Sequence, residues 1–311
     1  MDSLSPVLRS IRLRSQIYFR KDFPSPWGFD MAANEVSQFH LVARGRCFFK
    51  VDGAEVIHQV NAGDAILLPH GQAHWLASEA TAPRLPGTAA FSSGSVEDLP
   101  PGEDSTTLIC GHFELDRGLD HPLIESLPQW ILVPASERRQ ATWLETSTTL
   151  LIDEMGSGEP GSEALVNRLA EGLFILLLRA FILRNRGKEG YFAALADRRL
   201  SRALGAIHDS PGDSWSLPTL ASLSGMSRSS FADRFSRLVG MPPMKYLGQW
   251  RLQRARELLR DTELPLSAIA GDVGFASEGA FGRAFKRHFR INPGALRRQG
   301  AMPHPETRAT S

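Results

Sequence analysis

Six side chains in the N-terminal third of the chain carry donor atoms that hold soft metal ions or react with oxidants. They are His40, Cys47, His70, His74, Cys110 and His112. Imidazole nitrogen combined with thiolate sulfur is the donor set of zinc and copper sites. Cys110 and His112 are two residues apart in a strand-like run, so we expect them on one face of that strand. These residues are therefore candidates for an effector, metal or redox site.

Two interpretations of these six residues stay open. In the first, the fold assembles a zinc or copper site, or a thiol pair that reports oxidants if one thiol is exposed and of low pKa. In the second, His70 is a polar loop residue, His74 is a satisfied histidine at a barrel mouth, and Cys47 and Cys110 are small apolar core residues. With 2 cysteines in 311 residues, a disulfide framework is excluded and both are expected as thiols. No cofactor is required by the sequence.

The elements that position these side chains lie in a strand-like region, residues 39–114. Short apolar runs alternate there with Gly, Asn and Asp, and Asp52-Gly53 favours a hairpin. The spacing of four residues, G-x5-P-x-G-x2-H, resembles the second cupin motif, and the residues are Gly63, Pro69, Gly71 and His74. Only His40 and Gly45 suggest the first motif. The resemblance implies a cupin-like barrel with an incomplete metal shell, of the kind that senses an effector: a small molecule, a metal or an oxidant.

The C-terminal third contains one pattern twice. It occupies residues 220–243 and again residues 269–293. Phe231 returns 50 positions later as Phe281, whereas Gly225 returns 49 positions later as Gly274, so one residue is added inside the turn. Each copy predicts a short helix, a Gly-centred turn and a second helix with Phe at i and i+4 on its buried face. This is a helix-turn-helix in duplicate, and a long apolar-striped helix after Pro243 joins the copies. Their second helices would reach successive major-groove turns about 34 Å apart.

Charge is divided along the chain in the same way. Residues 195–300 carry 17 Lys and Arg against 9 Asp and Glu, whereas residues 1–194 carry 17 against 24. The net charges are therefore +8 and −7, although the whole chain has a formal charge of only +1. A basic module attached to an acidic remainder is typical of a protein that binds double-stranded DNA through one part only.

The duplicated pattern resembles the C-terminal domain of AraC/XylS-type transcription regulators over residues 200–298. Its most specific stretches are WRLQRARELL (residues 250–259) and VGFASEGAFGRAFKRHFRINPGALR (residues 273–297). One departure is that Arg290 follows Phe289 where the family has Gly, which removes an easy left-handed C-cap. Some AraC-type regulators also carry cupin-type sensor halves, which the N-terminal region resembles.

The residues expected to read bases lie at outward positions around Phe231 and Phe281, and they are Arg228, Ser229, Asp233, Ser277, Glu278 and Arg283. The resemblance implies that the positions two before and one or two after each Phe face the groove, which are Ser229, Ala232, Asp233, Gly279, Gly282 and Arg283. Among these, Arg283 is the best candidate for a bidentate contact to guanine. Residues assigned to phosphates are Arg234, Arg237, Lys245, Lys286, Arg287 and Arg290. For any one of them the alternative is a solvated helix face, and Glu278 is equally suited to the helix macrodipole.

Two helices are expected between the barrel and the DNA-binding region, at residues 136–155 and 162–186. The second has an apolar face too wide for a surface helix, which predicts a homodimer contact or burial against the barrel of the same subunit. Its apolar stretch is interrupted by Arg179 and is shorter than a membrane span of about 20 residues. The start of the chain lacks a secretory signal pattern, so we expect a cytoplasmic protein that does not associate with membranes.

The expected fold is two-domain α+β: an N-terminal cupin-like β-barrel with dimerisation helices, and a C-terminal all-α double helix-turn-helix. The expected boundaries are 1–118 for the barrel, 119–190 for the helical connector and 195–300 for the DNA-binding domain. The predicted function is a sequence-specific transcription regulator, not an enzyme, whose effector modulates DNA binding. The alternatives are a cupin-type metalloenzyme fused to a DNA-binding domain and an architectural DNA binder without a sensor. RNA polymerase is a further candidate partner, since the sequence does not separate activation from repression.

Overall fold

The computed structural model describes residues 3–11, 13–88, 104–115, 122–135, 138–185 and 188–300, with side chains described outside 138–145 and 299–300. The chain forms two compact units. The sheet unit holds the described residues between 13 and 115 and those of 123–185, and the helical unit holds 3–11 and 188–300. Helix α1 (Ser5–Ile11) thus belongs to the helical unit although it precedes the strands. Most of the expected helical connector, residues 119–190, belongs to the sheet unit, which includes residues 123–185.

The sheet unit is a sandwich of two five-stranded sheets, so the expected barrel is open rather than closed. The first sheet has the order β1 (Arg14–Pro24), β9 (Ser105–Glu114), β3 (Ser37–Arg44), β6 (Ala65–Leu68), β10 (Ile131–Val133). The second has the order β5 (His58–Asn61), β4 (Arg46–Val51), β7 (His74–Ala77), β2 (Gly28–Met31), β8 (Leu85–Pro86). The short helix α3 (Pro122–Glu125) precedes β10. This architecture agrees with the cupin-like prediction.

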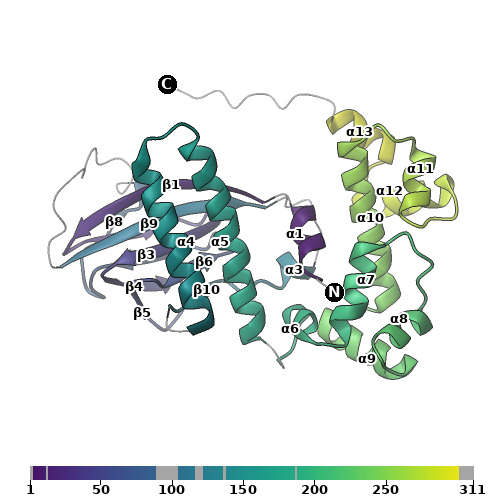
Figure 1. Ribbon diagram of the computed structural model, residues 1–311, viewed down its shortest axis with the longest axis horizontal. Coiled ribbons are helices and arrows are strands. Elements are labelled where there is room, and N and C mark those ends of the chain that lie inside the picture. Colours follow the sequence, from purple (N-terminus) through teal and green to yellow (C-terminus); the bar gives the residue numbers. More distant parts are fainter. Residues whose placement is uncertain are drawn as a thin grey trace. The chain divides into compact units, whose positions relative to one another are not determined.

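Both faces of the first sheet are covered. Strand β9 is buried from Ser105 to Phe113: Leu108 and Cys110 lie in the core between the sheets, and Phe113 on the other face contacts helix α5. Figure 1 shows α4 (Arg138–Ser157) and α5 (Ser162–Arg184) lying together across this sheet. The Phe174 ring of α5 lies 5.0 Å from that of Phe113, measured between centroids. The predicted burial of the second helix against its own subunit is therefore present over one face of α5.

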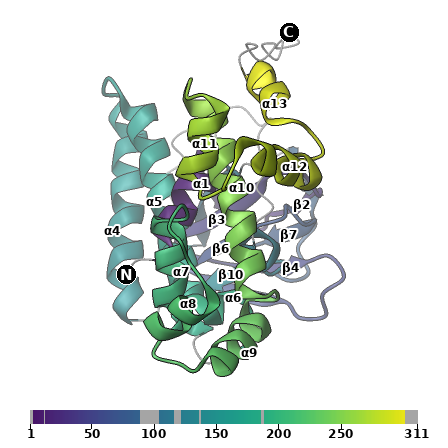
Figure 2. The same cartoon turned by 90° about the vertical axis from the view of Figure 1, so that its right-hand side faces the viewer.

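The helical unit contains the duplicated pattern. Its helices are α6 (Tyr191–Ala196), α7 (Leu200–Asp209), α8 (Leu217–Leu223), α9 (Arg228–Val239), α10 (Pro243–Asp261), α11 (Leu266–Asp272), α12 (Glu278–Phe289) and α13 (Pro293–Gly300). Helices α9 and α12 begin 50 residues apart, whereas α8 and α11 begin 49 apart. Figure 2 shows α10 running between the pair α8–α9 and the pair α11–α12. The predicted double helix-turn-helix is confirmed.

The turn of each copy is built by the same residue types. Gly225 and Gly274 have φ of 62° and 80°, a left-handed conformation that suits glycine. The following helix is capped by a serine: Ser227 Oγ accepts from the Ser230 N–H and Ser277 Oγ from the Ala280 N–H. The residue added in the second copy lies between Gly274 and Ser277.

The two second helices end alike even though their sequences differ. Helix α9 ends at Gly240 with φ 81°, and α12 ends at Arg290 with φ 61°. The expected loss of a left-handed C-cap at Arg290 is therefore wrong. Arginine adopts the conformation itself, and its N–H donates to the Lys286 carbonyl at 2.9 Å. Arg290 is the one non-glycine residue with positive φ in the described part of the chain.

Candidate functional site

The cupin-like motif forms a turn that delivers His74 into the core of the sheet unit. The motif begins before β6, turns at Gly71 and ends on the first residue of β7. Gly71 has φ of 65°, its N–H donates to the Leu68 carbonyl, and its carbonyl accepts from the Asn34 N–H. A Cβ at this position would collide with the Asn34 backbone. The glycine of the motif is thus required by a close approach of two backbone segments.

His74 is linked to two other predicted site residues, directly to His40 and through it to Cys110. Its Nε2 lies 2.8 Å from His40 Nε2, and His40 Nδ1 lies 3.0 Å from Cys110 Sγ. His40 and Cys110 face each other because β3 and β9 pair in that register. On the far side, His74 Nδ1 lies 2.8 Å from the carbonyl oxygen of Gln72. Cys110, His40 and His74 therefore form a chain of hydrogen bonds that we call the sensor relay.

The direction of each hydrogen bond in the relay follows from its fixed end. The Gln72 carbonyl only accepts, so His74 Nδ1 carries a proton and the Nε2 of a neutral His74 is an acceptor. His40 therefore donates from Nε2, which leaves His40 Nδ1 free to accept from the Cys110 thiol. One protonation pattern, with both imidazoles neutral and the thiol protonated, satisfies every contact.

Burial favours the same neutral pattern. His40 and His74 are 2% and 1% exposed, and desolvation lowers the pKa of both, that of His74 to about 4. Burial, together with the neighbouring Cys47, raises the pKa of the Cys110 thiol. Burial, reinforced by Asp64, raises the pKa of Cys47 to about 12. Neither cysteine is the exposed thiol of low pKa that a simple redox pair requires, so that part of the expectation is wrong.

The structure separates the other predicted residues from the relay. Cys47 lies in the apolar core of the sheet unit, among Val42, Val60 and their neighbours. His70 is exposed in the turn, and its Nε2 donates to the Leu127 carbonyl at 2.9 Å. His112 lies beside Glu114, with 3.6 Å between Nε2 and Oε1. Of the six candidates, three therefore form the relay, with one buried sulfur nearby, while His70 lies in a turn and Cys47 in the core, as the second interpretation expects.

The donor atoms of the relay do not converge on one point. His40 turns Nδ1 toward Cys110 and Nε2 toward His74, so its two nitrogens face different partners. Across the described residues there is no group of three or more His, Cys, Asp or Glu side chains that could hold a metal ion. The geometry does not fit the expected zinc or copper site, which stays a prediction for a metal analysis of the purified protein.

A small hollow lies against the relay. Its volume is about 20 Å³, and it is lined by Tyr18, Phe19, Phe23, Phe29, Met31, Gln38, His40, Leu76, Leu108, Cys110 and Gly111. A hollow of this size holds about one water molecule. An organic effector would have to displace core side chains, whereas a molecule of two or three heavy atoms requires little rearrangement.

The predicted DNA-contacting residues of the helical unit are all exposed. Phe231, Phe235, Phe281 and Phe285 are fully buried, which fixes the outward faces of α9 and α12. The exposed residues are Arg228, Ser229, Asp233, Arg234, Arg237, Lys245, Ser277, Glu278, Arg283, Lys286, Arg287 and Arg290. Three of these have structural partners, since Ser277 caps α12, Arg234 pairs with Asp197, and Ser229 Oγ lies 3.4 Å from Ser227 Oγ. The hydroxyl of Ser277 is thus already engaged.

Comparisons with known proteins agree with this arrangement. A cupin family model matches residues 2–182, and a helix-turn-helix domain model matches residues 220–299. A putative AraC-like transcription regulator from Streptomyces antibioticus is 33% identical over 300 residues, covering 96% of this chain and 99% of the relative. This chain belongs to the AraC-like transcription regulators. It is a DNA-binding regulator with a cupin N-terminal domain, as the sequence predicts.

Two further similarities extend the comparison. The RCS-specific HTH-type transcriptional activator RclR of Escherichia coli strain K12 is 28% identical over 300 residues, covering 96% of this chain and 97% of the relative. A crystal structure of a regulator with an AraC-type DNA-binding domain from Chromobacterium violaceum is 31% identical, covers 34% of this chain and 94% of that one, and has a TM-score of 0.32. Within the described residues of this AraC-like regulator, no helix has the length and apolarity needed to cross a membrane.

Two functional groups escape the sequence patterns. The Gln72 carbonyl fixes the tautomer of His74, and backbone groups give no signal in a list of side chains. Asp197 holds Arg234 and the first N–H groups at α7, at Arg199 and Leu200. Its position just before a helix resembles an N-cap, which is a detectable signal. Its ion pair with Arg234, 37 positions away, has no such signal in the sequence.

Proposed function

We propose that the sheet unit senses a small electrophilic oxidant at Cys110 and that this event changes the affinity of the helical unit for its DNA site. The sensor relay is the single observation that carries the proposal. A thiol that donates to a neutral imidazole can transfer its proton to that imidazole as the sulfur attacks, so reactivity does not require a preformed thiolate.

The relay gives the thiol proton a path away from the sulfur. The Cys110 proton moves to His40 Nδ1 while the His40 Nε2 proton moves to His74 Nε2. The resulting His74 cation is held by the Gln72 carbonyl, and Asp52 also favours the charged form of His74. The two histidines thereby move the positive charge away from the reacting sulfur.

The chemical step balances with hypochlorous acid as the oxidant. The sulfur loses two electrons and gains a hydroxyl group, the chlorine gains two electrons and leaves as chloride, and a proton is released through the relay. The product is a sulfenic acid, a reversible oxidation state of cysteine. Its added oxygen requires room, and the hollow of about 20 Å³ beside Cys110 provides little beyond that. An oxygen placed there contacts residues of β1, β2, β3 and β7, which line the hollow. Through these contacts oxidation would alter the packing of the sheet unit.

Two observations favour an oxidant over the other predicted effectors. The hollow is too small for an organic ligand without rearrangement, and the relay nitrogens do not converge as metal ligands would. One relative, RclR, carries the name of an RCS-specific activator. The same small hollow speaks against a metalloenzyme that would admit a substrate. We therefore propose a sensor and not an enzyme.

The test compares Cys110→Ser with the matched control Cys47→Ser, because both replace a buried thiol of the same core. Affinity for the operator is measured by fluorescence anisotropy before and after a stoichiometric amount of hypochlorite. We expect the wild type and Cys47→Ser to change affinity and Cys110→Ser to keep its initial value. If Cys110→Ser changed its operator affinity with hypochlorite as much as the wild type does, the result would contradict the proposal and direct the search to metal or organic effectors.

We also propose that the regulator forms a homodimer through α4 and α5. Three leucines stay exposed there although the opposite face of α5 is buried: Leu150, Leu165 and Leu183 are 50%, 47% and 54% exposed. A second copy that brings the same apolar residues would cover them. Sedimentation of the Leu165→Glu variant tests this, with Glu163→Gln on the same helix as the control. A monomer is expected only for Leu165→Glu.

A further inference from the structure

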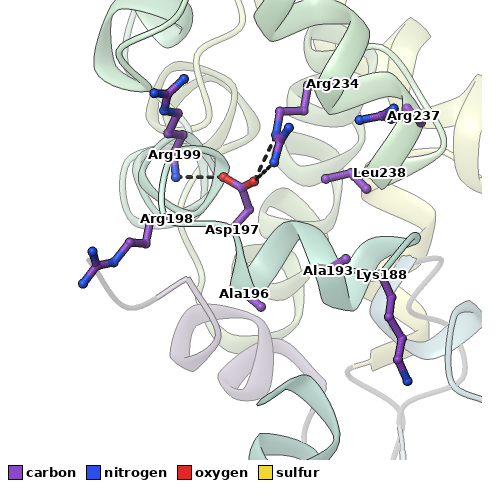
Figure 3. Close-up of a pocket in the computed structure, with 9 residues that line it drawn as sticks. All are labelled: Lys188, Ala193, Ala196, Asp197, Arg198, Arg199, Arg234, Arg237 and Leu238. Atoms are coloured by element: carbon purple, nitrogen blue, oxygen red, sulfur yellow. Dashed lines mark hydrogen bonds and ion pairs between the residues drawn. The ribbon is translucent and has the colours of Figure 1, made fainter. Parts of the chain in front are cut away.

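A large hollow in the helical unit is surrounded by positive charge. Its volume is about 930 Å³, and it is lined by Lys188, Ala193, Ala196, Asp197, Arg198, Arg199, Arg234, Arg237 and Leu238. Figure 3 shows Asp197 and Arg234 at its centre, Arg198 and Arg199 on one side, and Arg237 and Lys188 on the other. The lining comes from the segment that leads into the helical unit, from α6, from the start of α7 and from helix α9.

The single carboxylate of the hollow is fully engaged. Asp197 Oδ1 accepts from the N–H groups of Arg199 and Leu200 at 2.8 and 3.0 Å, and Oδ2 accepts from Arg234 Nε and Nη2 at 3.0 and 2.5 Å. Burial alone would raise the pKa of Asp197, but these hydrogen bonds lower it below its usual value. Asp197 is 11% exposed and remains ionised at neutral pH. It joins the start of α7 to α9.

This pairing leaves an excess of positive charge. Five basic side chains and one carboxylate line the hollow, which is a net charge of +4. Within the described chain no carboxylate lies in ion-pair contact with Lys188, Arg198, Arg199 or Arg237. Like charges gathered in one concave surface raise its potential and attract an anion.

We propose that this hollow is a phosphate-binding site in which Lys188, Arg198 and Arg199 extend the DNA contact of helix α9 along the sugar-phosphate backbone. The inference rests on the DNA-binding role of the family and not on the oxidant response. It adds contacts from the segment before and around α7, which lies outside both helix-turn-helix copies.

The size of the hollow favours a phosphodiester chain over a single phosphate ion. A volume of about 930 Å³ is roughly thirty times the volume that one water molecule occupies in the liquid. The cations also lie on two opposite sides of Asp197 rather than around one point. Phosphates spaced along a strand match that distribution. A free phosphorylated metabolite carries the same phosphate group, so the experiment must distinguish it from the DNA backbone.

The experiment compares Arg199→Gln with Arg202→Gln in the full chain. Arg199 is the N-cap of α7, and Arg202 is exposed in the first turn of that helix but does not line the hollow. Operator affinity is measured at 50 and 200 mM salt. Without DNA, the thermal unfolding midpoint is measured with inorganic phosphate and with pyrophosphate. The hypochlorite response is recorded in the same samples, so a failure of the sensor proposal is visible separately.

Loss of one phosphate contact flattens the dependence of log affinity on log salt by about 0.9. The weakening of Arg199→Gln relative to wild type should therefore shrink about three- to fourfold between 50 and 200 mM salt. Arg202→Gln should follow the wild-type slope. Equal slopes for both variants would overturn the proposed site. A midpoint shift with pyrophosphate that Arg199→Gln abolishes, with DNA affinity unchanged, would overturn the DNA assignment in favour of a free phosphorylated ligand.

Discussion

Replacing Arg290 by glycine should stabilise the helical unit, because Arg290 ends α12 in a left-handed conformation. Its φ and ψ are 61° and 10°, close to the 81° and 0° of the equivalent Gly240. The left-handed region costs a non-glycine residue about 1–2 kcal/mol, and glycine removes this strain. Glycine also makes the unfolded chain more flexible, which lowers the stability of the folded state by about 0.4–1 kcal/mol. The expected net gain in the free energy of unfolding is about 0.5–1 kcal/mol.

Gly240→Ala is the matched opposite change. A Cβ at Gly240 would meet no atom within 4 Å, so the substitution introduces backbone strain without a clash. The expected loss is again about 0.5–1 kcal/mol. A change of 1 kcal/mol moves the midpoint of a domain of this size by about 4–8 °C. The two variants should therefore shift the thermal midpoint of the helical unit by a few degrees in opposite directions.

Measurement of operator binding tests a second role of Arg290, the predicted phosphate contact of its side chain, separately from its effect on stability. If its side chain contacts a phosphate, as the sequence predicts, Arg290→Gly should weaken binding and flatten the salt dependence while the thermal midpoint rises. A lower midpoint for Arg290→Gly, or a shift of both variants in the same direction, would refute the argument from backbone strain.

Two other predictions concern the relay and the recognition helices. Burial lowers the pKa of His74 to about 4 in the folded state. The unfolded state therefore binds more protons than the folded state between pH 6.5 and 4. The free energy of unfolding falls as the pH falls through that window. Urea unfolding at pH 7 and 5 should show a loss of about 2 kcal/mol attributable to His74, absent in His74→Gln; an equal loss in that variant would contradict it. Arg283→Ala should relax sequence preference by about 1–3 kcal/mol, whereas Arg287→Ala should weaken specific and random DNA alike. Equal losses on both DNAs for both variants would remove the distinction.

The helical unit is predictable from sequence because its determinants are local. Helical periodicity places Phe231 and Phe281 inside, and glycine at Gly225 and Gly274 marks each turn. The 49- and 50-residue spacings recur in the helix boundaries themselves. The left-handed end at Arg290 is not predictable from its residue type, because the repeated tertiary packing after α12 overrides the preference of arginine for other conformations.

The sensor relay depends on contacts that sequence spacing does not encode. The motif that ends at His74 is readable, but the contact between His40 and Cys110 follows from the register of two strands 70 residues apart. Periodicity along β9 places Cys110 and His112 on one face and still does not reveal that only Cys110 meets a histidine. The pKa of each thiol depends on whether its side chain is buried, and the sequence around the two cysteines does not show this.

The most direct test of control by Cys110 follows the oxidation of this thiol and the operator affinity in one sample. The protein is titrated with hypochlorite, and the oxidised fraction of Cys110 is measured by mass spectrometry alongside operator affinity. If Cys110 controls DNA binding, the two curves coincide and reduction with a thiol restores both. Full oxidation of Cys110 without a change in affinity, or a change in affinity before Cys110 reacts, would contradict the claim that this thiol controls DNA binding.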